Sequence, residues 1–324
     1  MGTVAVFGAY GHTGRFVVSE LVSRGFVPLL LGRDASKLAA SGLDHRVASV
    51  DDPASIDAAL KGAVAVINCA GPFASTAAPV ISAALRAGIP YVDVAAEIEA
   101  NVDTFALFAD SAGVPVVPAM AFFGGLGDLL ATTAMGDWAE ADSVDVAYGL
   151  SSWYPTAGTL ASGTVSRDRR AGQRVRFTGG KLEYYVAAGD LPAQEWDFPA
   201  PLGRRTVLRG FTMADVVTVP SHLRVPEVRT HMTAVAAADL AAASASVDSA
   251  VQTFTVDVVV RRGDESRRMV ASGRDIYAVS APLAVEAVAR ILDGRTRARG
   301  VASAGAMFDA PDFLRALSTH LRVS

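Results

Sequence analysis

The sequence predicts an α/β protein with a doubly wound parallel sheet, followed by a second α+β domain built on a mostly antiparallel sheet. Three observations support this fold class. Short apolar runs alternate with helical patterns up to about residue 122, and a glycine-rich turn joins the first run to the first helical pattern. Beyond residue 122, strand-like runs predominate.

The first part reads as alternating strands and helices. Strands are expected at 3–7, 27–31, 46–49, 64–68, 90–94 and 114–118, and helices at 14–24, 35–40, 53–60, 76–87 and 98–111. Asp52 followed by Pro53 is a typical helix start. Because short strands separated by helices pair in parallel, residues 1–122 are predicted to form one domain.

Residues 123–280 are predicted to form the second domain. A helix is expected from about Gly124 to Trp138, and strands at 143–150, 207–208, 215–219, 253–261 and 267–273. Residues 176–205, rich in Gly, Pro and charge, predict a long excursion. Helices return at 281–292 and 310–321, and the segment 281–324 is expected to pack back on the first domain.

The turn after the first strand has the spacing G-x-x-G-x-x-G. A strand, a glycine turn and a helix in succession are typical of the Rossmann dinucleotide-binding motif, in which a pyrophosphate lies at the helix N-terminus. The alternative is a glycine turn that only packs. The candidate cofactor-binding residues here are Gly8, Tyr10, Gly11, His12, Thr13, Gly14 and Arg15.

The end of the second strand predicts which dinucleotide is bound. Arg33 stands where an acidic residue usually holds the ribose of NAD, and its guanidinium suits a 2′-phosphate. We therefore expect NADP (NADPH), with NAD less favoured. The alternative for Arg33 is a solvated surface charge. Asp34 could hydrogen-bond a ribose, but it is also well placed to cap the helix that starts at Ala35.

The end of the fourth strand is expected to run along the cofactor, because ligands of such sheets bind beyond the carboxyl ends of the strands. The alternative is an ordinary strand-to-helix loop. The candidate residues are Asn68, Cys69, Ala70, Gly71, Pro72 and Phe73.

Three residues are candidate acids or bases. Glu97, after the fifth strand, could exchange a proton with substrate or cap the helix beginning near Ile98. Tyr154 and His222 are the other candidates, although a surface-loop histidine is the favoured alternative for His222. The candidate substrate wall consists of Trp153, Tyr154, Gly158 and Thr159, with a buried structural anchor as the alternative for Trp153.

Composition argues against a nucleic-acid-binding protein and against a membrane-spanning one. A net charge of −4 argues against a nucleic-acid surface, and the most apolar stretch, 234–251, is interrupted by Asp239 and Asp248, so no membrane span is expected. The single cysteine, Cys69, fits a reducing, cytoplasmic compartment, and no Cys/His set predicts a metal site.

Several segments resemble the saccharopine dehydrogenase-like oxidoreductase family, which includes saccharopine reductase relatives and trans-acting enoyl reductases. They are 6–15, 31–33, 68–73 and 87–93, with Glu97, Gly158–Ser162 and Gly273–Tyr277 matching later family segments. The resemblance implies a Rossmann domain, a nicotinamide cofactor, and a discontinuous second domain that often mediates dimerisation, hence a homodimer.

These features together predict an NADPH-dependent oxidoreductase acting on a small molecule. The resemblance implies that the hydride goes to a C=C (enoyl) or C=N (imine) bond. Two alternatives stay open: a non-catalytic NADP-sensing regulatory protein, and an isomerase or epimerase that holds its cofactor tightly.

Overall fold

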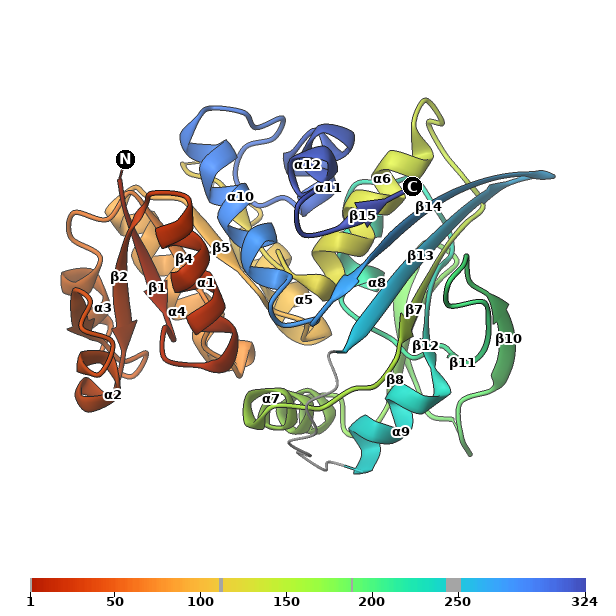
Figure 1. Ribbon diagram of the computed structural model, residues 1–324, viewed down its shortest axis with the longest axis horizontal. Helices are drawn as coiled ribbons and strands as arrows, with labels where there is room; N and C mark the ends of the chain where they lie inside the picture. The colour runs from red at the N-terminus through yellow and green to blue at the C-terminus, as the bar shows by residue number, and fades with distance from the viewer. Residues whose placement is uncertain (1, 111–112, 188, 243–251) are drawn as a thin grey trace.

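The computed structural model describes residues 2–110, 113–187, 189–242 and 252–324. Two sheets form the frame of the molecule (Figure 1). A six-stranded sheet takes the strands of the amino-terminal part, and a nine-stranded sheet takes those that follow residue 142.

The first sheet is entirely parallel and has the order β3-β2-β1-β4-β5-β6. Its strands are β1 Thr3–Phe7, β2 Val27–Gly32, β3 His45–Val47, β4 Ala65–Asn68, β5 Tyr91–Asp93 and β6 Val116–Val117. Val4 and Val6 face one hydrophobic cluster while Ala5 and Phe7 face another, so β1 is buried on both sides. The predicted doubly wound parallel sheet is confirmed.

Five helices connect these strands: α1 His12–Ser23, α2 Ala35–Ala39, α3 Pro53–Ala59, α4 Phe73–Ala87 and α5 Ile98–Phe108. Asp52 accepts a hydrogen bond from the Ser55 N–H at the start of α3, which confirms the predicted cap. The chain leaves β1 toward β2 and later returns to its other side as β4. The carboxyl ends of β1 and β4 therefore border the switch point, where such sheets bind ligands.

The second sheet has the order β10-β11-β12-β7-β13-β14-β15, with β8 pairing with both β12 and β9. Among the described strands of this sheet, only β12 and β7 pair in parallel, so the prediction of a mostly antiparallel sheet is confirmed. The strands are β7 Ser143–Leu150, β8 Arg174–Thr178, β9 Lys181–Tyr185, β10 Ala193–Asp197, β11 Arg204–Arg209, β12 Val228–Thr233, β13 Thr253–Arg262, β14 Glu265–Arg274 and β15 Arg322–Val323.

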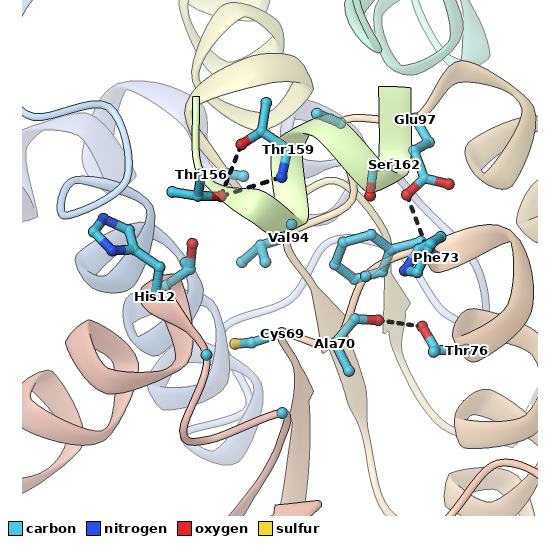
Figure 2. A pocket seen from close by; sticks show the side chains of 18 of the residues that line it. His12, Cys69, Ala70, Phe73, Thr76, Val94, Glu97, Thr156, Thr159 and Ser162 are labelled. Carbon is cyan, nitrogen blue, oxygen red and sulfur yellow. Dashed lines mark hydrogen bonds between the residues drawn. The ribbon is translucent and has the colours of Figure 1, made fainter. Parts of the chain in front are cut away.

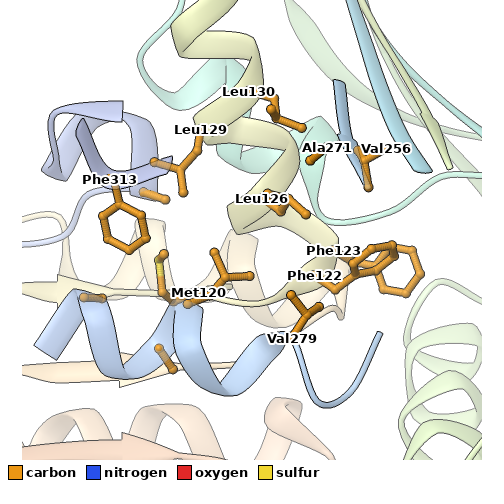
Figure 3. Packing of buried hydrophobic residues seen from close by; sticks show 14 of the residues in the cluster. Met120, Phe122, Phe123, Leu126, Leu129, Leu130, Val256, Ala271, Val279 and Phe313 are labelled. Atoms are coloured by element: carbon orange, nitrogen blue, oxygen red, sulfur yellow. The ribbon is translucent and has the colours of Figure 1, made fainter. Parts of the chain in front are cut away.

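The helices of this part are the π-helical turn η1 Phe122–Leu126, α6 Gly127–Met135, α7 Ala157–Arg169, α8 Asp215–Thr218, the 3₁₀ turn η2 Val219–Ser221, α9 Ala234–Ala242, α10 Ser280–Leu292, α11 Ala304–Met307 and α12 Ala310–Ala316. They divide between the second sheet, which α6, α8 and α9 contact, and the first part of the chain, which α7 and α10 contact. In Figure 3, Leu129 of α6 points toward Phe313 and Leu130 toward the sheet. Burying each of these leucines stabilises the fold by about 1.5–3 kcal/mol.

Two predicted features of the second part are wrong. Residues 215–219 form α8 and the start of η2 rather than a strand, because one helical turn buries Val216 and Val219 together while Asp215 accepts the Tyr148 hydroxyl. Residues 176–205 are not an excursion, since they contain most of β8 and all of β9 and β10. Their charges pair across strands, as Arg176 does with Glu183, and the β8–β9 turn is Gly179-Gly180 with both φ positive.

The carboxyl-terminal segment divides between the two sheets. α10 lies against α1 (Figure 1), where Glu286 pairs with Arg24. After α10 the chain touches the edge of the first sheet once more, where Val301 bridges in parallel to Val116 of β6. The rest packs on the second part: α12 contacts α6, and β15 pairs with β14. The domain limits at residues 122 and 280 stay a prediction.

The helices within the described ranges are all too short or too polar to cross a membrane. The apolar stretch 234–251 begins as α9, and its residues 243–251 lie outside the described part of the chain.

Candidate functional site

A cavity of about 790 Å³ lies between the carboxyl edge of the first sheet and the second part of the chain. Its walls come from the loops after β1, β2, β3, β4 and β5 on one side, and from α7 and the segments around Phe123, Phe211 and Tyr277 on the other. In Figure 2, Thr159 and Ser162 of α7 lie above Cys69 and Ala70 of the loop after β4. The volume is within the range of ligand-binding clefts.

The glycine turn can form only without side chains. Gly8 has a φ of +82°, and a Cβ there would lie 2.8 Å from Ala70. A Cβ on Gly14 would lie 2.3 Å from the carbonyl oxygen of Gly8. Gly14 itself does not line the cavity, so its role is to let α1 pack against the turn. The predicted residues that do line it here are Gly8, Tyr10, Gly11, His12, Thr13 and Arg15.

The first turn of α1 faces this cavity with free hydrogen-bond capacity. Its N-cap, Gly11, has no side chain to accept from the N–H groups, and no acidic residue lies in the first turn. The Arg15 Nε donates to the Tyr10 carbonyl oxygen at 3.0 Å, which braces the turn. This cradle fits the pyrophosphate of a dinucleotide, since the helix N-terminus is positive and the glycines leave room.

Arg33 and Asp34 follow β2 but differ in surroundings. Arg33 is exposed, lines the cavity, and takes part in no hydrogen bond or ion pair within the described residues. Asp34 does not line the cavity: it accepts from the Ser36 hydroxyl and the Lys37 N–H, which lower its pKa to about 2. The prediction that Asp34 caps the helix is confirmed, and its expected contact with a ribose is not supported.

The loop after β4 contributes Cys69, Ala70, Gly71, Pro72 and Phe73 to the cavity. Asn68, predicted with them, is fully buried behind the loop. Its Nδ2 donates to the Tyr91 hydroxyl at 3.1 Å, and its Oδ1 accepts from the Ala70 N–H at 3.0 Å. Asn68 therefore shapes the loop and does not face the ligand space.

Glu97 lines the cavity, but its carboxylate is hydrogen-bonded to the start of a helix. Its carboxylate accepts from the N–H groups of Phe73 at 2.8 Å and Ala74 at 3.1 Å (Figure 2). These groups begin α4, so Glu97 caps that helix and not the one beginning at Ile98. Neither sequence-based alternative anticipated this partner.

The opposite wall centres on the hydroxyl of Tyr277. It accepts from the Trp153 indole N–H at 3.1 Å and lies 2.9 Å from the Thr159 Oγ1. Thr156 caps α7 through the Thr159 N–H, and Trp153, Gly158 and Thr159 line the cavity as predicted. Tyr277 was not predicted as a site residue, although the resemblance of the segment Gly273–Tyr277 to the family could have indicated it.

Tyr154 and His222 do not line the cavity, so neither predicted acid is brought to it. Tyr154 is hydrogen-bonded to the opposite wall through its carbonyl oxygen, which accepts from the Tyr277 hydroxyl at 3.4 Å. The His222 Nε2 lies 2.7 Å from the Asp128 Oδ1 at the far side of η1 and α6. Burial lowers the pKa of His222, but the charge and hydrogen bond of Asp128 outweigh it, so the net shift is upward.

Several lining residues were not predicted at all. Ser49, Val50 and Asp51 follow β3, and Phe123 and Phe211 come from the second part. Ser162 and Arg167 project from α7, and Arg170 directly follows its last residue. Their approach depends on how α7 packs against α4 and α5.

Comparisons with known proteins agree with this geometry. A family model described as NAD(P)H-binding matches residues 8–109. The saccharopine dehydrogenase-like oxidoreductase of Bos taurus is 32% identical over 117 residues, covering 29% of this chain and 27% of that protein. Its Homo sapiens counterpart is 31% identical over the same shares. The chain thus covers about a quarter of the length of these curated relatives.

A solved structure matches the whole fold. Apo saccharopine dehydrogenase (L-Glu forming) from Saccharomyces cerevisiae superposes with a TM-score of 0.68 over 100% of this chain and 99% of its own, at 11% identity. Identity this low shows a shared fold and nothing about substrate. Residues 8–109 thus match an NAD(P)H-binding family model, the whole chain shares the fold of saccharopine dehydrogenase, and a 117-residue stretch is similar to saccharopine dehydrogenase-like oxidoreductases.

Proposed function

We propose that the chain is an NADPH-dependent oxidoreductase that transfers a hydride to a C=C or C=N bond of a small molecule. One observation carries this proposal: a single cavity joins the glycine turn and Arg33 at one side to an aromatic and hydroxyl wall at the other. A cofactor bound at the glycine turn would reach a substrate held at the aromatic and hydroxyl wall.

The residues of the first side would each hold one part of the dinucleotide. The free N–H groups at the start of α1 and the bare glycine turn suit the pyrophosphate. The unpaired, exposed Arg33 suits a 2′-phosphate, which is the basis for preferring NADP over NAD. The nicotinamide cofactor supplies the hydride when bound.

The loop after β4 and the residues of α7 would orient the ring and exclude water. A Cβ on Gly71 would lie 2.8 Å from the Ser162 Oγ, so α7 closes directly over the loop. Glu97 would act by fixing the start of α4 below this point, since both its oxygens are hydrogen-bonded to that helix. Excluding water strengthens the polar interactions that orient the reactants.

The homodimer and the cytoplasmic location implied by resemblance and composition are part of the same proposal. Light scattering on the purified protein tests the first, and cell fractionation tests the second.

Calorimetric titration of nucleotide-free protein tests the proposal directly. We expect heat of binding with NADPH, and a clear loss in Gly14→Ala because the new Cβ would collide with the Gly8 carbonyl oxygen. Gly113→Ala is the matched control, since a Cβ there meets nothing within 4 Å. Circular dichroism would verify that both variants fold. Absence of binding to NADPH and NADP⁺ by the unmodified protein would refute the proposal.

A further inference from the structure

The second-sheet side of the cavity contains an apolar region that we name the aromatic chamber: Phe123, Trp153, Phe211, Met213 and Leu240. The rings of Phe123 and Trp153 lie 5.2 Å apart, and those of Trp153 and Phe211 6.3 Å apart. Phe123 and Trp153 are buried, whereas Phe211, Met213 and Leu240 are only partly buried by the rest of the protein. A ligand in the chamber would cover this remaining apolar surface.

The charged side chains of the cavity belong to other parts of its wall. Arg15, Arg33 and Asp51 lie on the dinucleotide side, and Glu97 is capping α4. Arg167 lies in the last turn of α7 and Arg170 follows the helix; at 1.5 Å per residue, Arg167 is about 12 Å along the axis from Thr159. Among the described lining residues, the chamber therefore offers no charge to pair with a charged substrate group.

One polar group reaches the edge of the chamber. The Tyr277 hydroxyl accepts from the Trp153 indole N–H and from the Thr156 N–H at 3.4 Å. With both acceptor positions taken, its proton is available to Thr159, to the Tyr154 carbonyl or to a ligand. The His12 ring, on the glycine turn, lies 5.0 Å from the Tyr277 ring, so this hydroxyl group borders the cofactor side as well.

We propose that the substrate is an uncharged conjugated carbonyl compound with an apolar ring or chain of about phenyl size. The apolar part fills the aromatic chamber, and the Tyr277 hydroxyl donates a hydrogen bond to the carbonyl oxygen. This inference rests on the proposed function. In it, NADPH is oxidised to NADP⁺ as its hydride adds to the β-carbon, the C=C pair shifts to the bond between the α-carbon and the carbonyl carbon, and the C=O pair moves onto oxygen. A solvent proton then adds to the α-carbon of this enolate as the C=O bond re-forms.

A chamber of this kind disfavours a charged substrate. A carboxylate entering it would lose its hydration without gaining a partner, so its binding is weakened. A neutral ring loses little hydration and gains contact with three aromatic side chains. The proposal therefore separates neutral from charged compounds of the same shape.

Binding of a matched pair of probes to the protein with NADP⁺ present tests this. The pair is benzylideneacetone and the same molecule bearing a para-carboxylate, with affinities measured by saturation-transfer NMR titration. We expect the neutral probe to bind at least about tenfold more tightly. Equal or tighter binding of the carboxylate would overturn the inference, as would binding of neither. NADPH affinity is measured separately, so its absence would instead refute the proposed function.

Two variants locate the site. Phe211→Ala removes a chamber wall while the loop stays anchored, because the Phe211 carbonyl oxygen accepts from the Thr230 hydroxyl and the Thr212 hydroxyl donates to the Val175 carbonyl oxygen. We expect roughly tenfold weaker binding of the neutral probe. Phe177 is a partly buried phenylalanine that does not line the cavity. Phe177→Ala is therefore the control and should leave the affinity for the neutral probe unchanged.

Tyr277→Phe tests the hydrogen bond. With NADPH affinity unchanged, we expect kcat for reduction of benzylideneacetone to fall by about 10²–10³ with a smaller change in KM. An unchanged kcat, or a loss confined to KM, would show that the hydroxyl does not polarise the carbonyl group. Wild-type protein that binds the probe as expected but never reduces it would also contradict the Tyr277 assignment.

Discussion

At the scale of single residues, the neighbours Arg33 and Asp34 have different roles: one lines the cavity, and the other stabilises the helix beside it. The Asp34 carboxylate caps the first turn of α2, where it accepts hydrogen bonds from the Ser36 hydroxyl and the Lys37 N–H. Arg33, one position earlier, makes no such bond and stays at the cavity wall. The same division separates Asn68, which holds the loop after β4, from Cys69 to Phe73, which face the cavity.

Arg33→Asp should therefore change cofactor preference. Removing a charge-assisted bond to the 2′-phosphate and adding repulsion should weaken NADPH by roughly 10–100-fold, while NADH changes little. Fluorescence titration with both cofactors measures this ratio. Lys61→Asp makes the same charge change at an exposed site outside the cavity and should leave the ratio alone. Equal weakening of both cofactors would show that Arg33 does not read the phosphate.

At the scale of elements, a buried carboxylate joins three helical segments beyond the cavity. Asp128, in the first turn of α6, accepts from the Gly305 N–H of α11 at 2.7 Å and pairs with His222 after η2. Asp215 of α8 lies close by; burial raises its pKa to about 7, and the charge of Asp128 adds to the rise. The His222–Asp128 pair thus contributes to the packing of α6 on the tail of the chain.

This pair should make stability depend on pH. The folded-state pKa of His222 is raised above its ordinary value of 6.5, so its ion pair stabilises the protein below that pH and is lost as pH rises through the folded pKa. We expect His222→Gln to lower the free energy of unfolding by about 2 kcal/mol at pH 5.5 and by less at pH 9.

Urea denaturation at the two pH values measures the difference. His45→Gln, an exposed histidine bonded only to the nearby Leu43 carbonyl oxygen, is the control and should show no such trend. A cost of His222→Gln that is the same at both pH values would argue against a charged pair.

At the scale of the whole molecule, the cavity exists because helices of the second part pack against the first part. α10 packs on α1, and α12 and β15 pack on the second sheet's side, so the last segment of the chain ties the halves together. α7 completes the enclosure by contacting α4 and α5 of the first part.

Cofactor binding should consequently protect both halves. Hydrogen exchange with and without NADPH is expected to slow at the glycine turn, 8–14, and also at the start of α7, 156–162, because the proposed ligand lies between them. The β8–β9 hairpin, 174–185, does not line the cavity and serves as the internal control. Protection restricted to the glycine turn would indicate that the second part does not close on the cofactor.

Sequence reasoning succeeded where the physical cause is local. The central strands β1 and β4 of the first sheet are buried on both faces, so they appear as apolar runs. The cap at Asp34 needs only residues two and three positions away. It failed where local preference was overridden. The β-branched run after Asp215 favours a strand, yet it turns into a helix that buries Asp215 against Tyr148, 67 positions away.

By itself, then, the amino-acid sequence determined the parallel sheet, its glycine turn and the presence of Arg33 at its edge, because each depends on neighbours along the chain. Only the tertiary structure decided the partners of Glu97, His222 and Tyr277, which lie 24, 94 and 124 positions away at Phe73, Asp128 and Trp153. Such pairs arise when separate elements pack together, and no local pattern records which carboxylate or hydroxyl group will meet which donor.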